Sequence, residues 1–211
     1  MANLEPLIQS IPVAPLKLAS LEGCRTLADQ VNNYLVSFRH ESPTNVGQAD
    51  SLQGYCADSY LLECECPRFG SGEGKGVLKE SVRGCDLFIM VDVTNYSLTY
   101  RVNGYENHMS PDNHYQDLKR IISAADGKAR RINVIMPFLY EGRQHKRSKR
   151  ESLDCALMLQ ELVDMGVSNI LTFDAHDPRV SNSIPLHGFD SFMPTYQFLK
   201  ALVNSVPEIG R

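Results

Sequence analysis

No long apolar run occurs anywhere in this sequence. None of its 211 residues lies in a stretch that approaches the roughly 18 uninterrupted apolar residues of a membrane-spanning helix. Residues 1–9 lack both the basic start and the apolar run of a secretory signal. We therefore expect a cytoplasmic protein that has no membrane partner.

Paired cysteine motifs are also missing. The six cysteines are scattered, no Cys-x-x-Cys occurs, and only Cys64 and Cys66 lie close together in the sequence. A disulfide framework and a zinc ribbon both need several cysteines at suitable spacing. Neither is indicated, and we expect most of the cysteines to be buried thiols.

An excess of basic residues is absent as well. The 21 Lys and Arg stand against 25 Asp and Glu, which gives a formal net charge of −4. A protein whose whole surface neutralises a phosphate backbone would instead carry an excess of basic residues. The basic runs 128–131 and 143–150 leave a local nucleic-acid surface open as an interpretation, but neither has interleaved aromatic residues for stacking bases. We rank it last and expect no nucleic-acid partner.

Helical and strand-like segments alternate along the chain. With 43% hydrophobic and 22% charged residues, the composition is that of an ordinary globular protein. Short apolar runs, as in strands covered on both faces, occupy residues 87–91, 132–136 and 170–173. Helical spacing or helix punctuation marks residues 24–38, 112–125, 153–165 and the segment from 194 onward. The pattern predicts one α/β domain over residues 1–211, with a mostly parallel sheet flanked by helices and a polar surface loop at 41–58.

A concentrated basic loop follows the second apolar run. Five of the eight residues in 143–150 are Lys or Arg. Ligands of open parallel sheets bind beyond the carboxyl ends of the strands. Guanidinium groups such as that of Arg143 pair with two phosphate oxygens at once, and Gln144 can add neutral hydrogen bonds. The loop therefore fits a polyphosphate ligand, although a solvated basic loop explains the same residues equally well.

Groups that can bind a metal or transfer a proton follow the third apolar run. Asp174, His176 and Asp177 come directly after it. Carboxylate and imidazole groups can hold Mg²⁺, which usually also binds oxygens of a substrate's phosphates. The alternative is a turn in which Asp174 caps backbone amides and Pro178 fixes the bend. The presence of both loops at neighbouring strand ends favours a magnesium nucleotide site.

Four short motifs stand in an order that matches a known family. Residues 69–73 resemble its Phe-x-Asp-Gly-Glu, and residues 80–89 resemble its Glu-x-Val-Arg-Gly-x-Asp-Val-Phe-Ile. Residues 137–144 resemble its Pro-Tyr-x-x-Tyr-Ala-Arg-Gln-Asp, and residues 174–176 its Asp-Leu-His. Each motif alone is weak, but together and in this order they are strong. The chain resembles the N-terminal half of a ribose-phosphate diphosphokinase, the enzyme that makes phosphoribosyl pyrophosphate.

This resemblance implies a phosphoribosyltransferase-like fold and a two-domain enzyme. Such an enzyme transfers the β,γ-diphosphoryl group of ATP to the C1 hydroxyl of ribose 5-phosphate, with Mg²⁺ as cofactor. By the resemblance, Arg143, Gln144 and Lys146 would bind ATP. His176 would serve as the catalytic residue at the ATP phosphates, and it would hold the Mg²⁺ together with Asp174.

The resemblance also implies contacts between subunits. Phe69 and Glu73 would frame the adenine of ATP in the site of a neighbouring subunit, so we expect self-association. A core Phe beside a glycine turn is the ordinary alternative for Phe69.

The chain departs from the family pattern at several positions. Ser71 stands where the family has Asp, Glu141 where it has an aromatic residue, and His145 where it has Asp. These departures support a second hypothesis, in which the protein is a non-catalytic regulatory or assembly homologue of the enzyme.

The acceptor half of the enzyme is missing from these residues. The family's ribose-phosphate loop carries two adjacent aspartates, and no Asp-Asp dipeptide occurs before the sequence ends at Arg211. We therefore expect the C-terminal domain, with most of the ribose 5-phosphate site, to be absent from this chain, which should be inactive alone.

Overall fold

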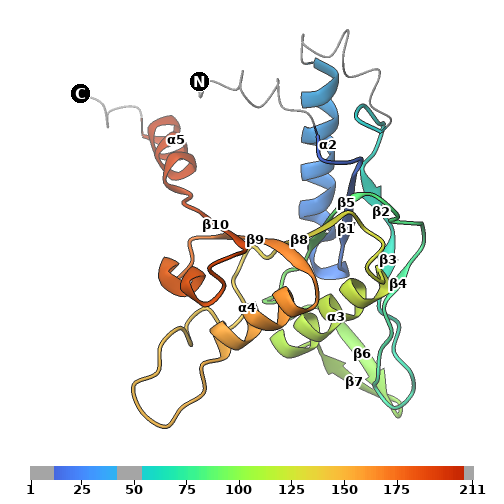
Figure 1. Cartoon of the computed structure of the whole chain (residues 1–211), viewed down its shortest axis with the longest axis vertical. Helices are drawn as coiled ribbons and strands as arrows, with labels where there is room; N and C mark the ends of the chain where they lie inside the picture. Colours follow the sequence, from blue (N-terminus) through green and yellow to red (C-terminus); the bar gives the residue numbers. More distant parts are fainter. Residues whose placement is uncertain (1–11, 42–53, 207–211) are drawn as a thin grey trace.

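A six-stranded parallel sheet forms the centre of the protein. In the computed structural model, which describes residues 12–41 and 54–206, the strand order is β10-β9-β8-β5-β1-β2 (Figure 1). The strands are β1 Leu16–Ser20, β2 Leu61–Leu62, β5 Asp86–Met90, β8 Arg131–Ile135, β9 Val167–Phe173 and β10 Gly188–Phe192. Every neighbouring pair in this sheet runs parallel, which confirms the predicted α/β class with its parallel sheet.

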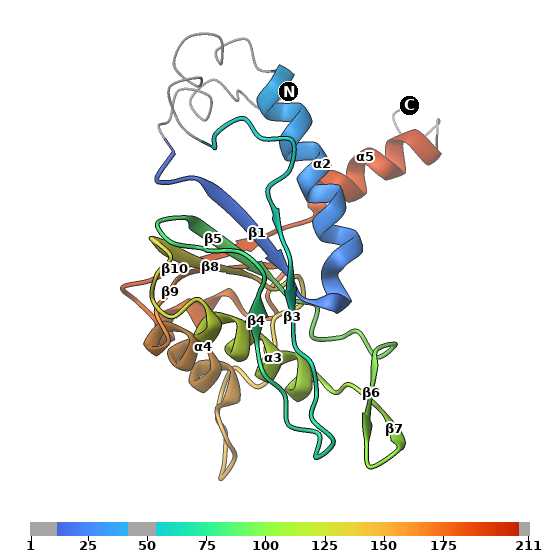
Figure 2. The ribbon, with the colours of Figure 1, turned by 90° about the vertical axis from the view of Figure 1, so that its right-hand side faces the viewer.

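Helices cover both faces of the sheet. Helix α2 (Arg25–Glu41) lies on one face, and α3 (Pro111–Ala124) and α4 (Asp154–Asp164) lie on the other (Figure 2). Helix α5 (Thr195–Ser205) follows β10 and projects away from the sheet, and none of its residues is buried. Within the described ranges, no helix is both long and apolar enough to cross a bilayer.

The apolar strand β5 shows why the central strands read as continuous apolar runs. Successive side chains of a strand point to opposite faces. Leu87 and Ile89 belong to the larger core, which also contains Leu118 of α3. Met90 belongs to a smaller core with residues of α2, and Phe88 packs against it. Because both faces are covered, the positions from Leu87 to Met90 favour apolar residues, whereas Asp86 at the start of the strand is buried in an ion pair with Arg131.

The chain path determines which loops become neighbours. From β1 the chain passes through α2 to β2 and returns to β5 on the other side of β1. It then runs through α3 to β8, through α4 to β9, and on to β10. Because β8 and β9 are parallel and adjacent, their carboxyl ends lie at the same edge of the sheet. The loops after these two strands therefore lie side by side.

The structure also contains elements that the sequence patterns do not predict. Besides β1, β2 and β10, these are two hairpins formed by β3 (Cys64–Glu65) with β4 (Val77–Leu78) and by β6 (Thr99–Val102) with β7 (Tyr105–His108). The turn of the second hairpin is Asn103-Gly104, with φ of 50° and 86°, which is a recognised hairpin signal in sequences. Most of the loop predicted at 41–58 lies outside the described residues.

Candidate functional site

Two loops meet at the carboxyl ends of β8 and β9. The first joins β8 to α4 and contains the basic loop (residues 143–150), and the second joins β9 to a short 3-10 helix, η4 (Pro178–Ser183). The rings of His145 and His176 lie 5.0 Å apart between centroids. His145 Nδ1 also lies 3.3 Å from Asp177 Oδ2. The structure thus brings together the two segments that the sequence singles out.

Hydrogen bonds within the first loop hold the basic loop closed. Gln144 Nε2 donates to the Ser152 carbonyl oxygen at 2.7 Å. At the far end, the Glu151 carboxylate accepts from the Ser148 backbone N–H at 2.6 Å and from its hydroxyl at 2.9 Å. These bonds from Ser148 lower the pKa of Glu151. Gln144 therefore closes the base of the loop, and Glu151 orders its tip.

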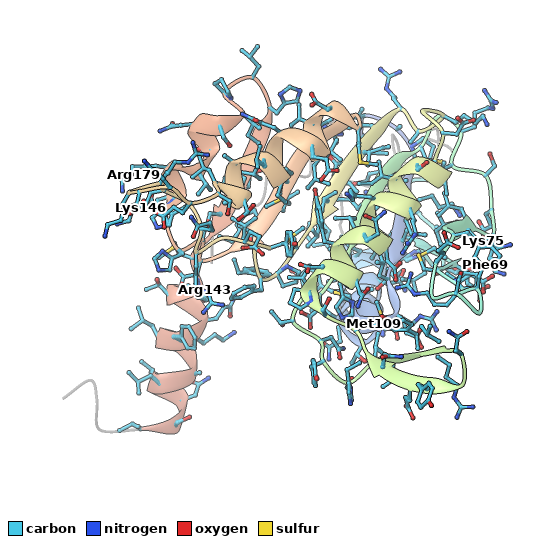
Figure 3. All side chains as sticks on the ribbon, turned by 90° about the horizontal axis from the view of Figure 1, so that it is seen from below. Phe69, Lys75, Met109, Arg143, Lys146 and Arg179 are labelled. Atoms are coloured by element: carbon cyan, nitrogen blue, oxygen red, sulfur yellow. The ribbon has the colours of Figure 1, made fainter. Side chains whose placement is uncertain are left out.

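The cationic side chains of the basic loop remain available to a ligand. Arg143 and Lys146 are exposed, and no carboxylate in the part of the chain that the structure describes pairs with either of them. They lie on the same side of the molecule as Arg179 (Figure 3). Exposed guanidinium and ammonium groups that form no ion pair are suited to bind phosphate oxygens.

Asp177 organises the second loop. Its carboxylate accepts from Arg179 Nε at 2.9 Å, from Arg179 Nη2 at 2.6 Å and from the Arg179 backbone N–H at 2.9 Å. These bonds, together with His145, lower the pKa of Asp177, so it is ionised at neutral pH. The residue that caps backbone amides here is thus Asp177, whereas the turn interpretation assigns that role to Asp174.

Asp174 and His176 are the two residues of the second loop that the sequence assigns to a Mg²⁺ ion. Both are exposed, and no group in the described segments donates a hydrogen bond to the Asp174 carboxylate. Among residues 12–41 and 54–206, no three His, Cys, Asp or Glu side chains gather to hold a metal. Mg²⁺ keeps several waters and usually shares phosphate oxygens with few protein ligands. A Mg²⁺ ion held by these two side chains would therefore need further oxygens from water and from a phosphate ligand.

Phe69 and Glu73 lie far from these loops. They belong to the turn between β3 and β4, and Figure 3 shows Phe69 on the opposite side of the molecule from Arg143, Lys146 and Arg179. Phe69 is 54% exposed, so the alternative of a core Phe is wrong. One chain does not bring Phe69 and Glu73 to the site at β8 and β9, so any role there requires a second copy.

Comparison with known proteins decides the family. The family model described as the N-terminal domain of ribose phosphate pyrophosphokinase matches residues 16–166. The chain belongs to this family. Ribose-phosphate diphosphokinase and ribose phosphate pyrophosphokinase are two names for the same enzyme. The resemblance stated from the sequence motifs is therefore confirmed.

Relatives of this ribose phosphate pyrophosphokinase N-terminal domain are longer than the chain. The ribose-phosphate pyrophosphokinases of Corynebacterium ammoniagenes and Bacillus cereus are each 29% identical over 167 residues, which make up 78% of this chain and 41% of each relative. That of Bacillus caldolyticus is 30% identical over 122 residues, or 57% of this chain and 34% of the relative. The chain thus spans less than half the length of the curated relatives that it matches.

A solved structure confirms the fold expected for this family. Phosphoribosylpyrophosphate synthetase from Mycobacterium smegmatis matches with a TM-score of 0.65 at 20% sequence identity. The match covers 90% of this chain and 52% of that chain. The phosphoribosyltransferase-like fold is therefore shown.

The contact of His145 with Asp177, which also binds Arg179, is the part of the site that sequence reasoning missed. His145 follows Gln144 in one loop, and Asp177 lies in another loop more than thirty residues later in the sequence. One signal was present, because an Asp before a Pro often begins a helix as its N-cap. That signal indicates the role of Asp177 in η4, but not its contact with His145.

Proposed function

We propose that the chain is the ATP-binding half of a ribose-phosphate diphosphokinase. The full enzyme would transfer the diphosphoryl group of ATP to C1 of ribose 5-phosphate and form phosphoribosyl pyrophosphate. The observation that carries this proposal is the meeting of the basic loop with the loop 174–177 at the ends of β8 and β9, shown by the 5.0 Å between the His145 and His176 rings. Family membership and the names of the relatives support it.

The residues of this site would act mainly by positioning and charge. Arg143 and Lys146 would bind phosphate oxygens and offset their charge, which is the main contribution of protein groups in phosphoryl transfer. Asp174 and His176 would hold the Mg²⁺, which when bound neutralises further phosphate charge. His176 would in addition lie against the phosphates as they transfer. Neutral or basic donors in fixed places need no reorganisation during the reaction.

Gln144 would contribute differently from the cationic residues. Its Nε2 donates to the Ser152 carbonyl oxygen at 2.7 Å and to that of Lys146 at 3.4 Å. The amide oxygen is the remaining polar atom of this side chain and only accepts hydrogen bonds. In this conformation Gln144 would therefore accept from an adenine amino group or a ribose hydroxyl while it keeps the loop closed.

Calorimetric titration of the protein with Mg·ATP tests the site. We expect His176→Ala to weaken binding by roughly tenfold or more, because hydrogen bonds to charged groups contribute about 1.5–3 kcal/mol. His187→Ala is the matched control, since His187 is an exposed histidine that precedes β10. Equal heats for wild type and His176→Ala, or no binding at millimolar nucleotide, would remove the site assignment.

A second candidate function is a non-catalytic assembly subunit. The observation that favours this function concerns His145, which stands where the family has Asp. Its side chain is 9% exposed and lies against Asp177, whose side chain is 12% exposed. Release of AMP from ATP by the full-length protein, with Mg²⁺ and ribose 5-phosphate present, separates the two. Ribose-dependent AMP supports the enzyme, and its absence from a folded protein that binds Mg·ATP supports the assembly subunit.

The 211-residue chain by itself should release no ribose-dependent AMP. Transfer needs the C1 hydroxyl in line with the β-phosphorus, and losing that alignment forfeits about 7–11 kcal/mol of barrier lowering. A rate near that of the full-length protein would show that the acceptor site lies within these residues.

A further inference from the structure

The turns of the two hairpins touch each other. The Asn103 N–H of the β6–β7 turn donates to the Gly70 carbonyl oxygen at 3.2 Å. A Cβ atom placed on Gly72 would lie 2.8 Å from Val102 Cγ2, which is closer than side-chain atoms pack. Gly72 also has φ of 92°, which favours glycine. The β6–β7 turn therefore lies directly against the segment that carries Phe69 and Glu73.

That segment, which we name the Phe69 loop (residues 66–76), is tightly bonded within itself. The Phe69 N–H donates to the Glu73 carbonyl oxygen at 2.7 Å, and the Gly72 N–H donates to the Phe69 carbonyl oxygen at 2.9 Å. The Ser71 hydroxyl donates to Glu73 Oε2 at 2.8 Å. Because Phe69, Gly72 and Glu73 share these bonds, a displacement at Gly72 moves both of the other residues.

The start of the Phe69 loop is anchored through Arg68. Its guanidinium makes two hydrogen bonds to the Asp117 carboxylate of α3, at 2.7 Å and 2.8 Å. The same guanidinium lies 5.2 Å from the centroid of the Tyr100 ring in β6. The β6–β7 hairpin thus supports the Phe69 loop at three points, which are Tyr100, Val102 and Asn103.

The base of the β6–β7 hairpin is in turn tied to the sheet and to α3. Asn95 Nδ2 donates to the Gly23 carbonyl oxygen, just after β1, at 3.0 Å. His114 of α3 is buried, and its Nε2 donates to the Asn95 carbonyl oxygen at 2.7 Å. The hairpin and the segments next to it line a cavity of about 460 Å³, whose lining includes Leu98, Tyr100 and Met109. Figure 3 shows Met109 beside the start of α3.

We propose that the β6–β7 hairpin fixes the position of the Phe69 loop, with Val102 as the positioning residue, and so determines where Phe69 and Glu73 are presented. The role of Phe69 and Glu73 toward a nucleotide rests on the proposed function. The positioning itself rests only on the contacts at Asn103, Val102 and Tyr100.

Hydrogen–deuterium exchange of the full-length protein tests the contact directly. We expect Val102→Ala to speed exchange of the Phe69 and Gly72 amides about fivefold, because the loop then opens more often. Val102→Thr keeps the branched shape and should exchange like wild type. Tyr105→Ala is the control within the same hairpin, since Tyr105 is 77% exposed. Unchanged exchange in Val102→Ala overturns the inference, whether or not the proposed function holds.

Steady-state kinetics of the same variants tests the consequence for the nucleotide. Val102→Ala should raise the KM for ATP about threefold and leave kcat nearly unchanged, as for a loss of uniform binding, and Val102→Thr should restore the KM. Faster exchange with an unchanged KM overturns the link to the nucleotide. Phe69→Ala separates the two failures: if it also leaves the KM unchanged, the proposed role of Phe69 is wrong while the hairpin contact stands.

Discussion

At the scale of single residues, Asp117 illustrates how a buried charge depends on its partners. Its carboxylate, 6% exposed, lies 2.7 Å from Arg68 Nη1 and 2.6 Å from Arg120 Nη1. Removing it leaves two partly buried guanidinium groups without a counter-charge. We expect Asp117→Ala to lower the free energy of unfolding by about 3 kcal/mol, measured by urea denaturation. Asp164→Ala, at an exposed position of α4, should leave the urea midpoint unchanged, and an equal loss in both variants would contradict this account.

The cysteines differ in reactivity because they differ in burial. Burial raises the pKa of Cys24, Cys64 and Cys155 to about 11 and that of Cys66 to about 12, whereas Cys56 is exposed. At a pH below the pKa, each unit by which the pKa is raised reduces the thiolate fraction about tenfold. At pH 8 we expect a thiol reagent to modify Cys56 quickly and these four slowly, as peptide mass spectrometry would show. Rapid labelling of Cys64 in the folded protein would contradict it.

The same raised pKa values have a consequence for stability. The fold favours the neutral thiol of Cys64, whose unfolded pKa is 9.0 and whose folded pKa is about 11. This contribution to the free energy of unfolding is therefore complete below about pH 9 and is lost as the pH rises toward 11. Thermal denaturation between pH 8 and pH 11 should show a falling midpoint over that range, and a less pronounced fall in Cys64→Ala.

At the scale of elements, helix α3 depends on the residue that caps its N-terminus. Ser110 precedes the helix in an extended conformation, and its hydroxyl oxygen accepts from the Asn113 N–H at 3.2 Å. Ser110→Ala should lower the free energy of unfolding by about 1 kcal/mol. Ser110→Asp keeps an acceptor at the cap and should retain most of the stability. If urea denaturation shows equal losses for both variants, the cap is not the cause.

The sequence predicts elements with a clear apolar pattern better than short or polar ones. Helix α3 is long enough for helical spacing to show, and β5, β8 and β9 contain apolar runs, whereas polar residues interrupt β1 and β10. Strands β2, β3 and β4 have two residues each, which is too few for any alternation to be seen. The turn at Asn103 carries a hairpin signal, but its flanking strands are polar and exposed, so no apolar pattern accompanies it.

At the scale of the whole molecule, the separation of Phe69 from Arg143 leads to a test of shared sites. Full-length Phe69→Ala and Arg143→Ala variants should each have low enzymatic activity. Mixing them should restore about a quarter of wild-type activity, because random exchange of subunits brings an intact Arg143 and an intact Phe69 to the same site one time in four. The control is a mixture of Arg143→Ala with His176→Ala, which should stay inactive because both residues serve the site of one chain. If the first mixture shows no gain, the site is not shared between copies.

The sequence by itself determined the α/β class, the family, and the positions of Arg143, Lys146, Asp174 and His176 in loops after apolar strands. These features are local, because periodicity and motifs extend over neighbouring residues. Only the tertiary structure decided that His145 meets Asp177, that Phe69 lies away from the basic loop, and that Val102 packs on Gly72. Such contacts join residues distant in sequence, and they depend on strand order and on close packing between hairpins, which no local pattern encodes.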